Sequence, residues 1–314
     1  MASFTKTYHR TTYSSISPSS PKLTQACRTV LIVGASSGIG FSIASAFIQA
    51  QASCIILLGR SAERLEAAVA DLKASHNTKT ELIPRQCDVS SKESMDNLWK
   101  ELEERDTAVH VMVLNAAHTG ATKDVEEGVS VFETNICANL RALDAFAKQG
   151  PKKGKGKVIL TMGDDKVLLY ISSMAAHMNP YPSHPHYAAS KAGYASLVQH
   201  LADETPVEEM QMISIHPGAV LTPSARKAGF DESSAPWDDA QLPASFCVWA
   251  STQAAAFLHG RFVWANWDVE ELMAMRDRVL SDPGFLKIGL QGVEHVAFPT
   301  IFKKIVEKTG MRAW

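Results

Sequence analysis

A tyrosine and a lysine four positions apart, Tyr187 and Lys191, are the residues whose types and spacing most directly indicate chemistry. On a helix, side chains at positions i and i+4 lie on the same face. The lysine ammonium is then close enough to lower the pKa of the phenol, because a neighbouring positive charge stabilises the phenolate. A phenol with a lowered pKa is a usable proton donor near neutral pH, so the pair predicts acid–base catalysis.

A glycine-rich turn, GASSGIG at residues 34–40, supplies a second signal. It follows an apolar run over residues 29–33 and opens a helical pattern that begins at Phe41. A strand, a glycine turn and a helix in this order bring backbone N–H groups close to a pyrophosphate at the start of the helix. The sequence therefore predicts a dinucleotide site, made by Gly34, Ser36, Ser37, Gly38, Ile39 and Gly40.

The spacing Gly-x-x-x-Gly-x-Gly, combined with Tyr-x-x-x-Lys, resembles the short-chain dehydrogenase/reductase family over residues 29–222. Two further segments, Thr5–His9 and Gly260–Val269, resemble a branch that is frequent in filamentous fungi. The resemblance implies that Tyr187 gives a proton to a substrate carbonyl, that Ser173 hydrogen-bonds the same oxygen, and that Lys191 holds the nicotinamide ribose. It also implies that Asn135 holds a water that links Lys191 to solvent. The predicted catalytic residues are Asn135, Ser173, Tyr187 and Lys191.

The residues after the second predicted strand indicate which cofactor is used. An NAD enzyme of this fold carries an acidic residue about 20 positions beyond the glycine turn, whereas this chain has Leu58-Gly59-Arg60-Ser61. Arg60 can make a bidentate, charge-assisted contact to a 2′-phosphate, and Ser61 can add a hydroxyl. The sequence therefore favours NADP(H). The alternative is that Arg60 is an ordinary solvated loop residue.

The resemblance implies further cofactor contacts. Asp88 would accept a hydrogen bond from the adenine amine beside Val89, although Asp88 can instead cap the following helix. Asn115, Ala116 and Ala117 stand where the family has Asn-Ala-Gly, so Ala117 replaces a glycine. The family motif Pro-Gly-x-Val-x-Thr is matched by Pro217, Gly218, Val220 and Thr222, and its Val and Thr would contact the nicotinamide carboxamide.

Apolar runs of strand length alternate with helical patterns along the chain. This alternation predicts the α/β class, with a doubly wound parallel sheet (Rossmann fold), helices on both faces and a single domain. Strands are expected near residues 29–33, 54–58, 81–85, 109–114 and 167–172 and before His216, and helices near 62–73, 92–104, 129–148 and from Tyr187.

Residues 1–27 are predicted to form an N-terminal arm over the Rossmann domain of residues 28–314. The arm is rich in Ser, Thr and Pro, and a transit peptide is the less favoured alternative because no Arg-rich amphipathic helix is present. The segment at residues 223–243 is expected to be a substrate lid, followed by helices that line the substrate pocket. A proline-rich loop at 178–186 should lie over the substrate carbonyl. The lysine-bearing insertion at 150–166 is either a hairpin or an extra loop.

The composition limits the partners. The 31 basic and 33 acidic side chains give no cationic excess, so nucleic acid is not expected as a partner. Five scattered cysteines and the lack of a long apolar stretch favour a cytoplasmic protein with no membrane partner. His184 and His186 have no evident third ligand, so no metal is expected.

These features predict an NADP(H)-dependent ketoreductase or secondary-alcohol dehydrogenase acting on a small molecule in secondary metabolism. Two alternatives stay open at this point: a non-redox isomerase or cyclase that keeps bound NADP(H), and a non-enzymatic NADP(H) sensor. The family resemblance further implies a homodimer or homotetramer built on the helices of Asn135 and Tyr187. The second helix is expected to present Ala188, Ala189, Ala195, Ser196 and Val198 outward.

Overall fold

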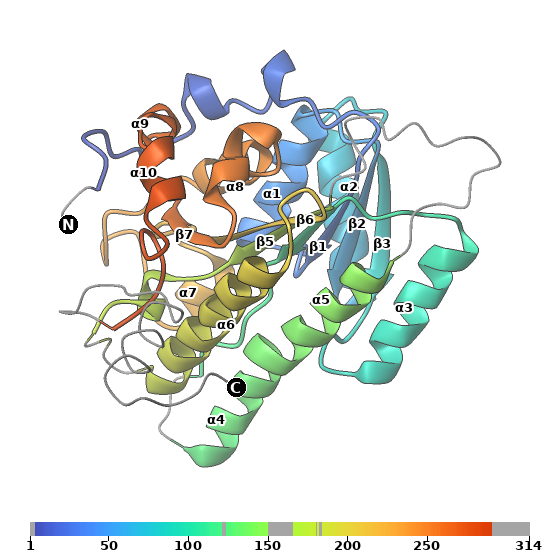
Figure 1. Cartoon of the computed structure of the whole chain (residues 1–314). Helices are drawn as coiled ribbons and strands as arrows, with labels where there is room; N and C mark the ends of the chain where they lie inside the picture. The colour runs from blue at the N-terminus through green and yellow to red at the C-terminus, as the bar shows by residue number, and fades with distance from the viewer. Residues whose placement is uncertain (1–3, 121–123, 150–165, 180, 182–183, 291–314) are drawn as a thin grey trace, which may run out of the picture.

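A computed structural model describes residues 4–120, 124–149, 166–179, 181 and 184–290 (Figure 1). Seven parallel strands form its centre, in the order β3-β2-β1-β4-β5-β6-β7. They are β1 Thr29–Val33, β2 Cys54–Gly59, β3 Glu81–Gln86, β4 Val111–Leu114, β5 Lys166–Ile171, β6 Met210–His216 and β7 Arg261–Trp264. Both faces of the sheet are covered, which is why β1 and β4 are continuous buried runs of mostly apolar residues. The structure confirms the predicted single-domain Rossmann fold.

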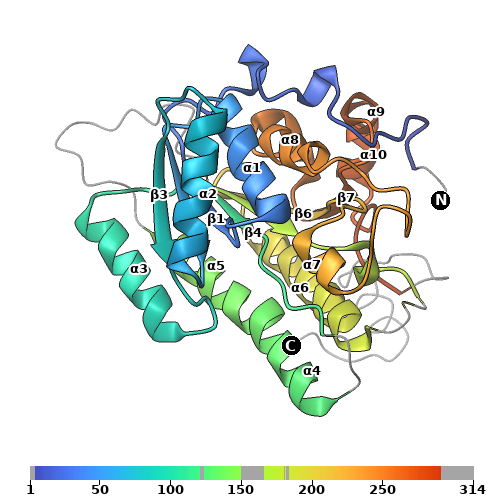
Figure 2. The same ribbon diagram turned by 180° about the vertical axis from the view of Figure 1, so that it is seen from behind.

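Helices pack on both faces of the sheet (Figures 1 and 2). On one face lie α1 Gly38–Gln49, α2 Ala62–Ser75 and α8 Gln241–Ala250, and on the other lie α3 Lys92–Glu104, α5 Ala138–Lys148 and α6 Pro185–Glu204. Successive strand residues point to opposite faces, so Val30 joins the first core and Leu31 the second. Shorter helices are α4 Val125–Phe132, α7 Pro223–Lys227, α9 Val269–Ala274 and α10 Arg276–Ser281.

Two predicted boundaries differ from the structure. The helix expected over 129–148 begins at Val125, because Asp124 caps it by accepting from the backbone N–H groups of Glu126 and Glu127. Inside it, η3 Glu133–Cys137 is a π-helical turn that joins α4 to α5. The strand expected from residue 109 begins at Val111. The first run of the lysine-bearing insertion, with its expected hairpin or loop, lies outside the described residues.

The outward face predicted for the Tyr187 helix is wrong at two positions. Ala195 and Val198 are buried in the core beneath α6. The exposed positions of α6 include Ala189, Gly193 and His200. Small apolar residues occur all round this helix, so its sequence pattern does not distinguish the core face from the outer face.

Residues 4–27 cross α8 and α9 as an extended arm that contains two short 3₁₀ turns, η1 Ser14–Ile16 and η2 Pro21–Leu23 (Figure 1). The side chains of Ile16 and Leu23 are buried in the same core as α1 and α8. Beneath the arm, α8 is buried from Leu242 to Ala250, so it contributes to the core. Within the described ranges, no helix is long and apolar enough to cross a membrane.

Candidate active site

The carboxyl ends of the parallel strands bring the predicted site residues to one edge of the sheet. Gly34 follows β1, Arg60 follows β2, Asn115 follows β4, Ser173 follows β5 and Pro217 follows β6. The strand order changes direction at β1, with β2 and β3 on one side and β4 to β7 on the other. In open α/β sheets, ligands bind outside the carboxyl ends of the strands at such a switch point.

The glycine turn is packed too closely for larger residues. A Cβ atom at Gly40 would lie 2.2 Å from the Gly34 carbonyl oxygen, and Gly34 itself has a φ of +80°. The Asn115 amide donates to the same carbonyl at 2.9 Å. The next residue, Ala116, donates its N–H to the Val33 carbonyl at 2.9 Å. These contacts hold the start of α1 against the end of β4.

The first turn of α1 suits an anion. Its N-cap residue, Ser37, makes no side-chain capping bond, and the turn contains no acidic residue. Backbone N–H groups at the start of a helix need a partner and favour negative charge. With no Cβ at Gly38 and Gly40, a phosphate can approach this backbone closely. The residues present therefore fit a dinucleotide pyrophosphate.

Ser173, Tyr187 and Lys191 come together where β5 leads to α6. The Ser173 side chain lies close enough to Tyr187 to lower the pKa of its phenol, and Tyr187 lies in the first turn of α6. The Lys191 Nζ atom donates to the Ile171 carbonyl at 2.7 Å and lies 5.7 Å from the centre of the Tyr187 ring. The ring of Tyr170, below, is 4.8 Å from the same ammonium.

The pKa of Tyr187 differs from the expectation. Burial raises the pKa of Tyr187 to about 12, and the neighbouring Ser173 hydroxyl offsets only part of this rise. Burial also lowers the pKa of Lys191 to about 7. Lys191 directs its ammonium at a backbone carbonyl, and the cost of burying a phenolate outweighs any lowering of the phenol pKa by this amine. In this structure, Tyr187 therefore keeps its proton at neutral pH.

Asn135 lies in the π-helical turn and is completely buried. Its amide nitrogen donates to the His118 carbonyl and to the Ser190 hydroxyl, both at 2.9 Å. Its side-chain oxygen accepts from the His118 N–H at 2.8 Å, and its main-chain oxygen accepts from Asn139 at 2.9 Å. Through these hydrogen bonds, Asn135 connects the π-helical turn to the segment after β4 and to α6. Its expected link to Lys191 through a water stays a prediction.

The ends of β2 and β3 carry the residues expected around the adenosine. Arg60 is exposed, and the Ser61 hydroxyl caps α2 by accepting from the Arg64 N–H at 3.3 Å. Hydrogen bonds from Ser90 are the first cause that holds the pKa of Asp88 below its usual value, and the charge of Arg60 contributes. The helix cap of α3 is Ser91 and not Asp88. The side chain of Val89 is buried beside this turn.

The segment Pro217–Thr222 runs from β6 toward the glycine turn. The Thr222 hydroxyl caps α7 by accepting from the Ala225 N–H at 3.1 Å. A Cβ at Gly38 would lie 3.5 Å from the side chains of Thr222 and Pro223. The residues predicted to bind the pyrophosphate and the nicotinamide are thus close to each other.

Two residues that the site prediction left out support the loop after Ser173. His216 accepts from the Met174 N–H at 3.1 Å, and burial lowers its pKa to about 3, so it is neutral. The Trp264 indole donates to His177 at 3.1 Å and packs edge-on against the His216 ring. Only their aromatic character near the Pro-Gly motif and in β7 could have indicated this role.

The family model described as short chain dehydrogenase matches residues 28–233. A short chain dehydrogenase/reductase of Claviceps purpurea is 36% identical over 296 residues, covering 91% of this chain and 94% of the relative. The short chain dehydrogenase/reductase nsrO of Aspergillus novofumigatus is 36% identical over 291 residues, covering 91% and 96%.

Among solved structures, the NADP complex of RhlG from Pseudomonas aeruginosa superposes with a TM-score of 0.67. It is 22% identical and covers 78% of this chain and 97% of its own. In the described part of the chain, no group of three or more His, Cys, Asp or Glu side chains is arranged to hold a metal ion. On the family match and the identity to these fungal relatives, the chain belongs to the short-chain dehydrogenase/reductase family of oxidoreductases.

Proposed function

We propose that this protein is an NADP(H)-dependent ketoreductase or secondary-alcohol dehydrogenase. The observation that carries the proposal is the grouping of Ser173, Tyr187 and Lys191 at the same edge of the sheet as the glycine turn. Carbonyl reduction needs one group to hold the carbonyl oxygen and one to protonate it. Ser173 and Tyr187 are such groups, and their side chains are neighbours in the structure.

Each of the three side chains has a defined part in the proposed reaction. The bound nicotinamide would supply or accept the hydride. Tyr187, whose pKa is about 12, carries the proton that the substrate oxygen needs at neutral pH. Ser173 donates a hydrogen bond to that oxygen. Lys191, with a pKa lowered to about 7 by burial, is partly cationic near neutral pH and stabilises the phenolate that proton transfer leaves behind.

The choice of NADP(H) over NAD(H) rests on the end of β2. Arg60 is an exposed cation beside the capped start of α2, a helix of 14 residues whose first N–H groups favour negative charge. No acidic side chain occupies the positions from Leu58 to Ser61. A 2′-phosphate would meet a guanidinium and a helix N-terminus there, whereas a carboxylate would repel it.

We further propose that the substrate is a bulky, largely apolar carbonyl compound or alcohol of fungal secondary metabolism. Met178 and Phe230 are large apolar side chains that remain exposed near the loop after Ser173 and on the proposed lid at residues 223–243. Phe230 packs edge-on against Trp237, which gives the lid an aromatic surface. The proline-rich loop at 178–186, part of which lies outside the described residues, would cover the carbonyl group.

A labelling experiment tests this function. Purified protein is first titrated with NADPH and NADH, and is then given a set of bulky aromatic ketones with NADPH deuterated at the transferable position. Deuterium on the product carbinol carbon supports the proposal. Turnover that needs NADPH but transfers no label would identify an isomerase or cyclase instead. Tight NADPH binding without turnover, across the whole set, would favour a sensor.

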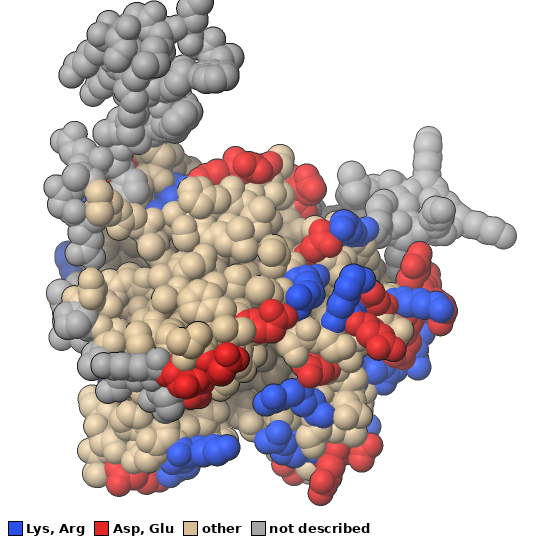
Figure 3. Space-filling view, turned by 90° about the horizontal axis from the view of Figure 1, so that it is seen from below, with Lys and Arg blue, Asp and Glu red and all other residues tan. Residues whose placement is uncertain are grey.

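We also propose a cytoplasmic homodimer or homotetramer. The arm at residues 4–27 packs into the core through Ile16 and Leu23, which argues against a removable targeting peptide. A row of apolar side chains is exposed on α4 and α5: Val125, Val129, Phe132 and Leu140. Figure 3 views the molecule from below, and residues other than Lys, Arg, Asp and Glu cover a broad area of that face. A second copy of the chain is the partner that the family resemblance favours.

A further inference from the structure

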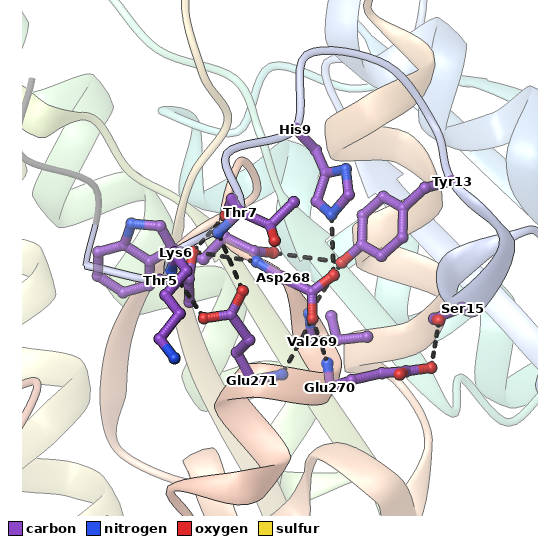
Figure 4. A network of polar contacts seen from close by, with 11 residues as sticks. Thr5, Lys6, Thr7, His9, Tyr13, Ser15, Asp268, Val269, Glu270 and Glu271 are labelled. Carbon is purple, nitrogen blue, oxygen red and sulfur yellow. Dashed lines mark hydrogen bonds and ion pairs between the residues drawn. The ribbon is translucent and has the colours of Figure 1, made fainter.

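The N-terminal arm is fixed to the start of α9 by a dense set of polar contacts (Figure 4). The carboxylate of Glu271 accepts from the backbone N–H groups of Lys6 and Thr7, at 2.7 and 2.9 Å. His9 contacts Asp268 at 2.8 Å, and Ser15 donates to Glu270 at 2.6 Å. These bonds hold the arm against the surface of the domain, away from the predicted catalytic residues.

Arg10, which follows His9 in the arm, contacts Trp237 and Asp238 instead of α9. Its Nε donates to the Asp238 carboxylate at 3.0 Å, and its Nη2 donates to the Trp237 carbonyl at 2.7 Å. The Arg10 carbonyl accepts from the Asp239 N–H at 2.9 Å. The side chain of Arg10 is 43% exposed, whereas that of Asp238 is only 3% exposed. Arg10 is thus a cation that reaches a buried carboxylate at the end of the proposed lid.

Asp238 in turn holds the loop after β6. Its Oδ2 accepts from the Ala219 N–H at 2.8 Å, and its own N–H donates to the Ala219 carbonyl at 2.6 Å. The buried amide of Asn266 donates to the same Oδ2 at 3.0 Å. A Cβ at Gly218 would lie 2.6 Å from this oxygen, so the contact needs a glycine there. Gly218 has a φ of +87°, which glycine adopts without strain.

We propose that Arg10 and Asp238 are positioning residues that connect the N-terminal arm to the nicotinamide end of the cofactor site. This inference rests on the proposed function, in which Val220 and Thr222 meet the nicotinamide. The connection runs from Arg10 through Asp238 to Gly218 and Ala219, and onward to Thr222, which packs near the glycine turn. The arm thereby fixes the position of a loop more than 200 residues away in sequence.

Arg10 does more than attach the arm to the surface of the domain, as a comparison with His9 shows. His9 also pairs with a carboxylate, but its partner Asp268 begins α9 and has no hydrogen bond to the Pro217–Thr222 segment among the described contacts. Removing either side chain loosens the arm. Only the loss of Arg10 leaves the Asp238 carboxylate without its cation and frees the loop that it holds.

The test compares two ligands that differ only in the nicotinamide: NADP⁺ and 2′-phospho-ADP-ribose, titrated by calorimetry into the full chain. For Arg10→Ala we expect NADP⁺ affinity to fall by about two- to fivefold, the range for loss of a partly exposed ion pair. The affinity for 2′-phospho-ADP-ribose should be unchanged. The matched control His9→Ala should alter neither affinity, although its melting temperature falls to a similar extent.

Other results of these titrations would contradict the positioning role of Arg10. Equal weakening of both ligands, no weakening, or the same loss in His9→Ala would overturn the positioning role and leave the proposed function standing. If the unaltered protein binds neither ligand, the proposed function fails and this inference fails with it. Arg10→Lys keeps the charge but cannot make both contacts, so its NADP⁺ affinity should lie between those of the unaltered protein and Arg10→Ala. That variant replaces Arg10→Ala if the latter does not fold.

Discussion

Tyr187 is the residue on which the proposed chemistry depends most. Its phenol lies beside the Ser173 side chain, and burial raises its pKa to about 12. Tyr187→Phe removes the proton but keeps the ring, so turnover should fall by about 10²–10⁴-fold, the usual contribution of a general acid. NADPH affinity, measured by titration, should change little.

The control for this substitution lies on the same helix. Tyr194 donates its hydroxyl to the Asn139 carbonyl at 3.0 Å and is completely buried, with its ring 4.6 Å from that of Tyr170. Tyr194→Phe should therefore reduce stability while turnover stays close to that of the unaltered protein. If Tyr187→Phe keeps more than about a tenth of the original rate, the proton comes from another group.

Arg60 should discriminate between the two nicotinamide cofactors. Arg60→Ala removes the proposed contact to the 2′-phosphate, which as a hydrogen bond to a charged group contributes about 1.5–3 kcal/mol. NADPH should bind correspondingly more weakly, and NADH affinity should be nearly unchanged, as measured by parallel titrations. Equal losses for both cofactors would mean that Arg60 shapes the loop and does not contact the phosphate.

His216 should make the protein sensitive to acid. Burial lowers its folded-state pKa to about 3, below the value of about 6.5 expected in the unfolded chain. The unfolded state then binds more protons as the pH falls, so stability is present above pH ~6.5 and is lost progressively toward pH ~3. The loss between pH 6.5 and pH 5 should be about 1.5 kcal/mol.

His216→Asn is the substitution that tests this linkage. The Asn side chain can still accept from the Met174 N–H, as His216 does, but it does not titrate. Denaturant unfolding at pH 6.5 and pH 5 should show a smaller difference for His216→Asn than for the unaltered protein. An identical difference in both proteins would assign the acid sensitivity to other groups.

At the scale of elements, the first turn of α1 packs so closely on the Gly34 carbonyl that position 40 should accept no residue larger than glycine. Gly40→Ala places a Cβ 2.2 Å from the Gly34 carbonyl oxygen, so the backbone must shift. We expect a loss of about 1–3 kcal/mol in the free energy of unfolding, as for other overpacked sites, together with weaker NADPH binding.

Gly193→Ala is the matched control, because this glycine also lies in a helix but is exposed. Its new Cβ would meet only the end of the Ile136 side chain, at 3.3 Å. An Ala in place of Gly inside a helix adds about 0.5–1 kcal/mol of stability. Equal destabilisation by both substitutions would show that the turn is less tightly packed than the structure indicates.

The elements themselves were predictable where local patterns are strong. β1, α1, β2 and the Tyr187 helix follow from apolar runs, the glycine turn and helical spacing. The π-helical turn around Asn135 has no local signal, because it arises from bonds to His118 and Ser190, which are distant in sequence. The inner and outer faces of α6 were also beyond prediction, since apolar residues occur on both.

The clustering of the motif residues was predictable from the sequence, whereas the residues that support them were not. Ser173, Tyr187 and Lys191 lie together as the motif spacing requires. The pKa of Tyr187 depends on how deeply the ring is buried and on the direction of the Lys191 ammonium, which spacing alone does not specify. The same holds for Asp238, whose partners lie in the N-terminal arm, after β6 and after β7.

At the scale of the whole molecule, assembly should depend on α4. Val129 on this helix and Leu280 on α10 are both 59% exposed, and the two helices lie in different parts of the molecule (Figure 1). A groove of about 400 Å³ lies beside Val129, lined also by Val125, Phe132 and His186. An aspartate at Val129 would place an unpaired charge in any apolar contact made there, which is costly.

Light scattering at micromolar protein should therefore report a dimer or tetramer for the unaltered chain. Val129→Asp should lower the measured mass to that of a smaller assembly or a monomer, while the fold remains intact because the side chain is exposed in the single chain. Leu280→Asp introduces the same charge at an equally exposed position, and its mass should equal that of the unaltered protein. A monomeric mass for the unaltered chain would refute the assembly, and the apolar face of α4 would then need a different partner.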